Sequence, residues 1–172
     1  ADGVTHTLRW RSLADVPPPR RVQLADDTLS ADAAYRLVCE GTALLWQGDF
    51  HQARQMLQAL GRRVDKAAER AAQRAPRTTD ITQTFHLHRK AQAERARILG
   101  LLLIPFDADH GIPLRRAPDA RLACLEAHGA VDAPHAASLR ELQGVIGAHE
   151  WRKKGVPVPA LGASVHPHHG VF

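Results

Sequence analysis

The sequence predicts an all-α fold: a bundle of about five helices with an extended N-terminal arm and an extended C-terminal connector. Alanine and arginine, both strong helix formers, account for 29 and 19 of the 172 residues. Aromatic residues, which favour strands, make up only 5% of the chain. Apolar residues also recur at helical spacing between proline and glycine breaks. The length fits one compact domain.

The first part of the chain is predicted to be an arm followed by two helices. Residues 1–28 contain three consecutive prolines, which favour an extended linker. A serine N-cap predicts a helix from Ala31 to Gln47, bent or interrupted at Gly41. Gly48-Asp49 then ends this helix and begins the next one, which stops before Pro76.

The rest of the chain is predicted to add three helices and a connector. One helix begins after Thr79-Asp80 and runs to Ile104, where a proline stops it, and its last residues are apolar on every side. Two shorter helices span about Asp119–His128 and His135–Lys153. The helical domain is thus expected over residues 29–154. The prolines and glycines of residues 155–172 predict an extended connector that leads to a domain outside this chain.

Several protein classes are excluded by composition. The longest strongly apolar stretch, Ile98–Phe106, is too short to cross a bilayer, which requires about 20 residues. The chain does not begin with a charged head followed by an apolar core, as a signal peptide would. The two cysteines, Cys39 and Cys124, fit no disulfide framework or metal-ligand spacing. These observations predict a cytoplasmic protein with no membrane partner.

Positive charge is concentrated between Arg62 and Arg97. This segment holds ten basic and four acidic residues, hence a net charge of +6, which exceeds the +5 of the whole chain. Such a surface attracts a phosphate backbone through counterion release, which favours RNA as a partner. The alternative is a solvated helix face with charges paired at i,i+4 spacing. The candidate residues for binding an anionic partner are Arg62, Arg63, Lys66, Arg70, Arg89, Lys90, Arg95 and Arg97.

Aromatic and histidine side chains could stack on RNA bases wherever they are exposed. The candidates are Phe85, His86 and Trp151, of which Phe85 is expected to lie in the core.

No catalytic, cofactor or metal site is predicted within these residues. The chain lacks the Gly-x-Ser-x-Gly, Gly-x-Gly-x-x-Gly and Gly-Lys-Ser/Thr motifs. In His86-x-His88 the two imidazoles would lie about 200° apart around a helix, so they cannot chelate one ion. The tract His166-x-His168-His169 has no further ligands beside it. The group Asp107-x-Asp109-His110 is expected to form a turn rather than a metal site.

A resemblance to a known family rests on four blocks of the chain: Phe85–Ala91, Ile104–Arg115, Gly147–Trp151 and the final His166-Pro167-His168-His169-Gly170-Val171-Phe172. The first three are similar to the N-terminal region of bacterial class I S-adenosylmethionine-dependent methyltransferases of the "methyltransferase small domain" type. The last block resembles the start of the catalytic domain in that group. The resemblance extends from about Val22 to the last residue.

The resemblance implies a non-catalytic N-terminal domain, with a substrate-recognition or scaffolding role toward RNA or a translation protein. The family's glycine-rich cofactor loop and its Asn-Pro-Pro-aromatic motif do not occur in these residues. S-adenosylmethionine is therefore expected in the parent enzyme's downstream catalytic domain, the implied partner, and not on this chain.

An alternative of another class is a helical protein-interaction module with no link to catalysis. It is favoured by the helical hairpin beginning at Gly48-Asp49-Phe50 and by the apolar segment Ile98–Ile104.

Overall fold

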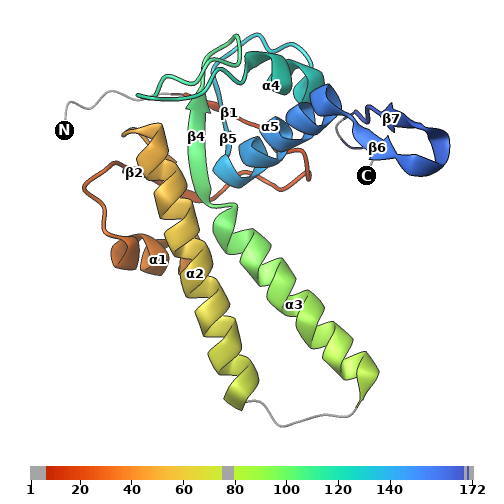
Figure 1. The fold of residues 1–172 in the computed structure, drawn as a ribbon. Coiled ribbons are helices and arrows are strands. Elements are labelled where there is room, and N and C mark those ends of the chain that lie inside the picture. Colours follow the sequence, from red (N-terminus) through yellow and green to blue (C-terminus); the bar gives the residue numbers. More distant parts are fainter. Residues whose placement is uncertain (1–6, 75–79, 169, 171–172) are drawn as a thin grey trace.

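The computed structural model describes residues 7–74, 80–168 and 170, and it is a mixed α/β fold (Figure 1). Its helices are α1 (Ala31–Cys39), α2 (Phe50–Arg74), α3 (Ile81–Leu99), α4 (Arg121–His128) and α5 (Leu139–Lys154). One sheet contains β1 (Arg9–Trp10), β2 (Arg21–Ala25), β3 (Thr42–Trp46), β4 (Leu102–Phe106) and β5 (His135–Ser138). After α5, a hairpin is formed by β6 (Val156–Val158), the short 3-10 helix η1 (Pro159–Leu161) and β7 (Ala163–Val165).

The prediction of an all-α bundle is therefore wrong, mainly because of two apolar runs. The sequence prediction extends helices through β3 and β4, whereas the structure ends those helices at Cys39 and Leu99. Gly41, at a φ of +83°, separates α1 from β3. Both strands are almost entirely buried. A strand buried on both faces is a continuous apolar run, which sequence periodicity cannot distinguish from a buried helical turn.

Three other predicted segments also change. The predicted arm contains β2, which pairs with β3 along its whole length and so belongs to the sheet. The predicted helix His135–Lys153 begins only at Leu139, because its first residues form β5. The predicted connector contains the β6–β7 hairpin. The expected helix near residues 119–128 is confirmed as α4.

All five described helices lie on one face of the sheet, whose strand order is β1-β5-β4-β3-β2. Strands β2, β3 and β4 are parallel, β5 is antiparallel to β4, and β1 is parallel to β5. The chain crosses from β2 to β3 through α1, and from β3 to β4 through α2 and α3. Because such crossovers are right-handed, two that step in the same direction place their helices on the same face. Helix α5 contacts both α2 and β4, and α4 packs on α5.

The core fills the space between this face and the helices. Alternate strand residues point toward the helices, among them Leu44 and its register partner Leu102, both fully buried. The indole N–H of the buried Trp46 donates to the carbonyl of Asp49 at 3.0 Å, so its one polar atom is satisfied. From the helices, the core receives Val38, Leu60, Leu99, Leu139 and Val145.

Helices α2 and α3 extend well beyond the core. Every residue of 65–74 and 80–94 is exposed. Figure 1 shows the two helices diverging as they leave the sheet. A surface helix normally buries an apolar stripe, so helices exposed all round are typical of segments that meet solvent or a partner.

Truncating a side chain in the buried half of this helix pair should destabilise the protein far more than truncating one in its exposed half. Leu60→Ala, at a fully buried position of α2, should lower the free energy of unfolding by about 2–5 kcal/mol through lost burial and the cavity left behind. Leu87→Ala on α3, where the side chain is 51% exposed, should change it by about 0.5 kcal/mol or less. Urea denaturation followed by circular dichroism measures both. Equal losses in the two variants would contradict this packing.

Candidate anion-binding cleft

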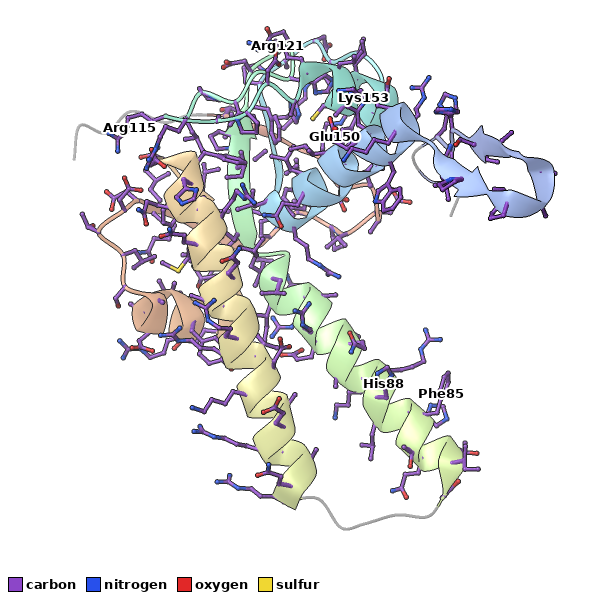
Figure 2. All side chains as sticks on the ribbon, in the orientation of Figure 1. Phe85, His88, Arg115, Arg121, Glu150 and Lys153 are labelled. Atoms are coloured by element: carbon purple, nitrogen blue, oxygen red, sulfur yellow. The ribbon has the colours of Figure 1, made fainter. Side chains whose placement is uncertain are left out.

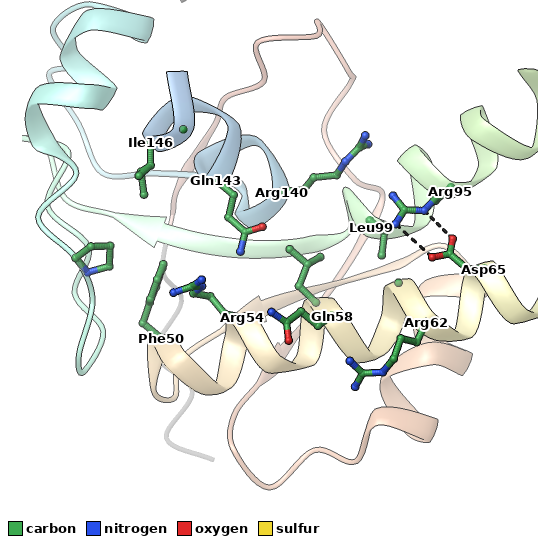
Figure 3. A pocket seen from close by; sticks show the side chains of 14 residues that line it. Phe50, Arg54, Gln58, Arg62, Asp65, Arg95, Leu99, Arg140, Gln143 and Ile146 are labelled. Carbon is green, nitrogen blue, oxygen red and sulfur yellow. Dashed lines mark hydrogen bonds and ion pairs between the residues drawn. The ribbon is translucent and has the colours of Figure 1, made fainter. Parts of the chain in front are cut away.

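A cleft of about 800 Å³ opens where α2, α3 and α5 meet (Figure 3). Its apolar lining includes Phe50 and Leu57 from α2, Leu99 from α3 and Ile146 from α5. The charged side chains around it come from the same three helices, as Figure 3 shows. The cleft therefore depends on the packing of segments that are far apart in the sequence.

Among the described residues, four arginines line this cleft against a single carboxylate, which gives this lining a net charge of +3. They are Arg54 and Arg62 on α2, Arg95 on α3 and Arg140 on α5, and the carboxylate is Asp65. The Arg95 Nε donates to Asp65 Oδ1 at 2.8 Å. Within residues 7–74, 80–168 and 170, the other three guanidinium groups have no carboxylate partner. Three guanidinium groups are thus available to an anion.

Helical spacing on α2 brings two of these arginines to one opening. On α2, Arg54, Gln58 and Arg62 recur every four residues and so share a face. Gly61 is buried where α2 approaches α3, and a Cβ there would lie 3.7 Å from the Arg95 guanidinium. A Cβ at this position would be in ordinary van der Waals contact with that guanidinium, so the glycine lies directly against Arg95.

The structure divides the eight predicted basic residues into three groups. Arg62 and Arg95 line the cleft. Arg63 and Arg97 are occupied by carboxylates. Two N–H groups of Arg63 donate to Oδ1 of Asp32 on α1, and Arg97 binds both carboxylate oxygens of Glu94. The remaining four lie on the exposed halves of α2 and α3: Lys66, Arg70, Arg89 and Lys90. The predicted basic segment also includes Arg77, which lies outside the described residues.

Two cleft arginines were not among the predicted residues. Arg54 shares the four-residue spacing of Arg62, so a search for basic residues along one helix face could have found it. Arg140 is distant in sequence from the basic segment, and only the packing of α5 against α2 brings it to the cleft. No local sequence signal marks it.

Two of the aromatic side chains predicted to stack on RNA are exposed. Phe85, expected in the core, is instead 56% exposed, and Figure 2 shows it projecting from α3 on the side away from α2. The Arg89 guanidinium carbon lies 5.8 Å from its ring centroid, within the range of a cation–π contact. The helical rise separates Phe85 from Arg95 along α3 by about 15 Å. Trp151, on α5, is also exposed.

A second charged cluster lies at the carboxyl ends of the parallel strands, where α/β proteins commonly bind ligands. Asp49, 1% exposed, caps α2: its Oδ1 accepts the His51 N–H at 2.8 Å. Its Oδ2 accepts Arg116 Nε at 2.6 Å, and this bond holds the pKa of Asp49 below its usual range. The Asp49 N–H in turn donates to Asp27 Oδ1 at 2.9 Å. Arg115 also pairs with Asp27.

This strand-end cluster does not fit S-adenosylmethionine. A Cβ on Gly48 would lie 2.3 Å from Asp27 Oδ1, so the carboxylate already fills the space that the glycine leaves. The charged groups there are satisfied by one another and by the first turn of α2. The cluster therefore joins the strand ends to α2 and leaves no cradle for a nucleoside.

The histidines form no recognisable metal centre. Across the described ranges, no group of three or more His, Cys, Asp or Glu side chains is arranged to hold a metal ion. The predicted turn at Asp107–His110 is closed by a hydrogen bond from the His110 N–H to the Asp107 carbonyl. His135 stacks on Phe106 at 4.8 Å between ring centroids, and burial lowers its pKa. His169 lies outside the described residues.

The two cysteines differ in their exposure to solvent. Cys39 is exposed, whereas Cys124 is buried, and burial raises the pKa of the Cys124 thiol to about 11. None of the described helices is long and apolar enough to span a membrane.

The chain matches no protein-family model, no curated protein and no solved structure. The resemblance to methyltransferases therefore stays a prediction from sequence.

Removal of the charge on Asp49 should make stability depend less on pH. Because its pKa is lowered in the folded state, the carboxylate contributes stability that is complete above the unfolded pKa of about 3.9 and is lost as the pH falls through the folded pKa. Asp49→Asn should thus lower the melting temperature at pH 7, and the difference from the wild type should shrink toward pH 3.

The matched control is Asp132→Asn, whose exposed carboxylate pairs with Arg9. It should have little effect at any pH, because exposed ion pairs contribute little. A gap between wild type and Asp49→Asn that stayed constant from pH 7 to pH 3 would count against an ionised cap.

Proposed function

We propose that this chain is the non-catalytic N-terminal domain of an S-adenosylmethionine-dependent methyltransferase, and that it recognises RNA through the arginine-lined cleft. The observation that carries the RNA proposal is that Arg54, Arg62 and Arg140 surround one opening and have no carboxylate partner within the part of the chain that the structure describes. Guanidinium groups bind phosphate through two parallel hydrogen bonds, which makes such an opening a good receptor for a phosphate backbone.

The exposed halves of α2 and α3 would extend this contact. Lys66 and Arg70 lie on α2 beyond the cleft, and Arg89 and Lys90 lie on α3. These side chains would hold further phosphates by charge, without reading sequence. Phe85, beside Arg89, offers an exposed ring on which an unpaired base could stack.

In this proposal the chain contributes binding and positioning, and methyl transfer belongs to the downstream catalytic domain. S-adenosylmethionine would be held there, since the strand ends of this chain are filled by their own ion pairs. The proposed setting is the cytoplasm, where RNA and translation proteins are available as substrates.

A second candidate function is protein recognition, with a translation protein as the partner. The observation that favours it is the group of exposed apolar side chains at the start of α3, where Ile81 is 85% exposed and Phe85 and Leu87 are about half exposed. The apolar segment Ile98–Ile104 does not support it, because five of those residues are buried in the core. The term helical module is also incorrect for a domain built on a sheet.

Removing two of the cleft arginines that have no carboxylate partner among the described residues should lower the affinity for RNA. It should also make that affinity less dependent on salt concentration. Arg62→Ala combined with Arg140→Ala should reduce the slope of log affinity against log salt by about 1.4, since each contact with a single-stranded phosphate contributes about 0.7. A filter-binding titration with a short single-stranded RNA at several salt concentrations measures this slope.

The matched control for that pair is Arg36→Ala combined with Lys154→Ala. It removes the same charge from exposed positions outside the cleft. The same loss in both double variants would show that net charge, rather than the cleft, determines binding. Failure of the wild type to retain RNA at low salt would refute the proposal altogether.

Removing the single carboxylate of the cleft should strengthen RNA binding. Asp65→Ala releases Arg95 and raises the net charge of the lining from +3 to +4. The salt slope should steepen by about 0.7 if Arg95 then contacts one further phosphate. Asp132→Ala changes the net charge equally and lies elsewhere, so it should leave the slope unchanged. Equal slopes in the two variants would exclude Arg95 from the contact.

A further inference from the structure

Strand β2 forms an open edge of the five-stranded sheet. It is the last strand in the order and pairs with β3 on one side only. Along residues 7–74, 80–168 and 170, no strand pairs with its other side. An edge with free backbone groups is a template for a further strand.

The backbone fixes which groups of β2 are free. The Gln47 N–H donates to the Ala25 carbonyl at 2.8 Å, so the peptide groups of Ala25 face β3. Alternate residues of a strand point the same way, so Gln23 and Arg21 also face β3. The N–H and C=O groups of Val22 and Leu24 therefore point away from the sheet. A second strand can pair only with these.

The side chains of this edge are unusually apolar for an open strand. Val22 is 51% exposed and Leu24 is 57% exposed. Their register partners on β3 are Ala43 and Leu45, so all four side chains share the face that carries no described helix. Native edges are usually protected by charges or prolines within the strand. The one charge within β2, Arg21, donates to the Glu40 carbonyl and lies on the other face from Val22 and Leu24. The face of Val22 and Leu24 therefore offers an apolar stripe, which a partner strand would extend.

Charge at the two ends of β2 indicates what that partner is. The strand is preceded by the exposed Arg20 and followed by Asp26, with Gln23 midway between them. In an antiparallel pair of two β2 strands centred on Gln23, Arg20 of each copy lies opposite Asp26 of the other. The same register places Val22 opposite Leu24 twice. The segment is thus complementary to itself in both charge and apolar character.

We propose that β2 pairs with β2 of a second copy of this chain, in antiparallel register about Gln23, to form a two-fold dimer with one continuous sheet. The register agrees with the backbone, because it brings the outward-facing groups of Val22 and Leu24 together as a hydrogen-bonded pair. A shift that places Val22 opposite Val22 sets Arg20 against Leu24 and loses the charge pairs. The Arg21 side chain does not intervene, since it donates to the Glu40 carbonyl.

This interface is independent of the RNA proposal. None of the residues lining the cleft belongs to β2, and the cleft lies on the helical face of the sheet. Pairing of one short strand buries less surface than a standard stable interface, so the dimer should dissociate on dilution. The assembly would carry two clefts, one on each copy.

Site-specific cross-linking tests both the partner and the register. In a Cys39→Ser background, which removes the exposed native thiol, Gln23→Cys places two thiols opposite each other at the two-fold axis. A non-hydrogen-bonded pair has Cα atoms about 4.5 Å apart, within the range of a disulfide. Leu24→Cys is the matched control, because its copies lie beyond the roughly 7 Å limit for a disulfide.

Mild oxidation of the full chain should give a disulfide-linked dimer with Gln23→Cys and little with Leu24→Cys. Sedimentation equilibrium of the wild type should show a dimeric fraction that increases with protein concentration. Val22→Lys combined with Leu24→Lys should leave a monomer with unchanged circular dichroism, because both side chains are already exposed. A wild type that stays monomeric at every concentration, or equal cross-linking at positions 23 and 24, would overturn the proposal.

Discussion

The buried carboxylate of Asp49 is the interaction on which the arrangement of the molecule depends. It accepts N–H groups from the first turn of α2 and a guanidinium N–H from Arg116, while its own N–H donates to Asp27. The ends of β2 and β3, the start of α2 and the loop after β4 therefore meet at one residue. If one of these segments moved away, the Asp49 carboxylate or one of its hydrogen-bond partners would be left buried and unpaired, which costs free energy. The contact therefore holds the four segments together. The direction of α2, and with it the position of the cleft, follows from this contact.

The sequence was sufficient to locate most helices and insufficient to find the sheet, and the physical reason is the burial of its strands. Helix α2 could be predicted from its capping aspartate and its apolar stripe, because both signals are local. Strands β3 and β4 carry no alternation, since both of their faces are covered, and their apolar runs also fit a buried helix. The β2 segment was obscured by the three prolines that precede it, and only pairing with β3 makes it a strand.

Only the part of the candidate site that follows from charge along a single helix could be predicted from the sequence. Charge density alone selected Arg62 and Arg95, and the structure brings both to the cleft. The same criterion selected Arg63 and Arg97, whose charges are neutralised by Asp32 and Glu94. Whether a basic residue is available depends on its carboxylate neighbours, which for Arg63 come from another helix. Arg140 reaches the cleft only through tertiary packing, which composition cannot show.

The one-sided arrangement of the helices separates the two proposed surfaces. Because both parallel crossovers step in the same direction, α1, α2 and α3 gather on one face and bring the basic residues of α2 and α3 with them. The last strand of that series, β2, then remains at the border of the sheet with apolar side chains on the opposite face. A polyanion is attracted to the first surface, whereas the second binds a further strand through backbone groups and apolar side chains. The same topology therefore places the arginine-lined cleft and the open edge on different parts of the molecule, so binding at one surface does not obstruct the other.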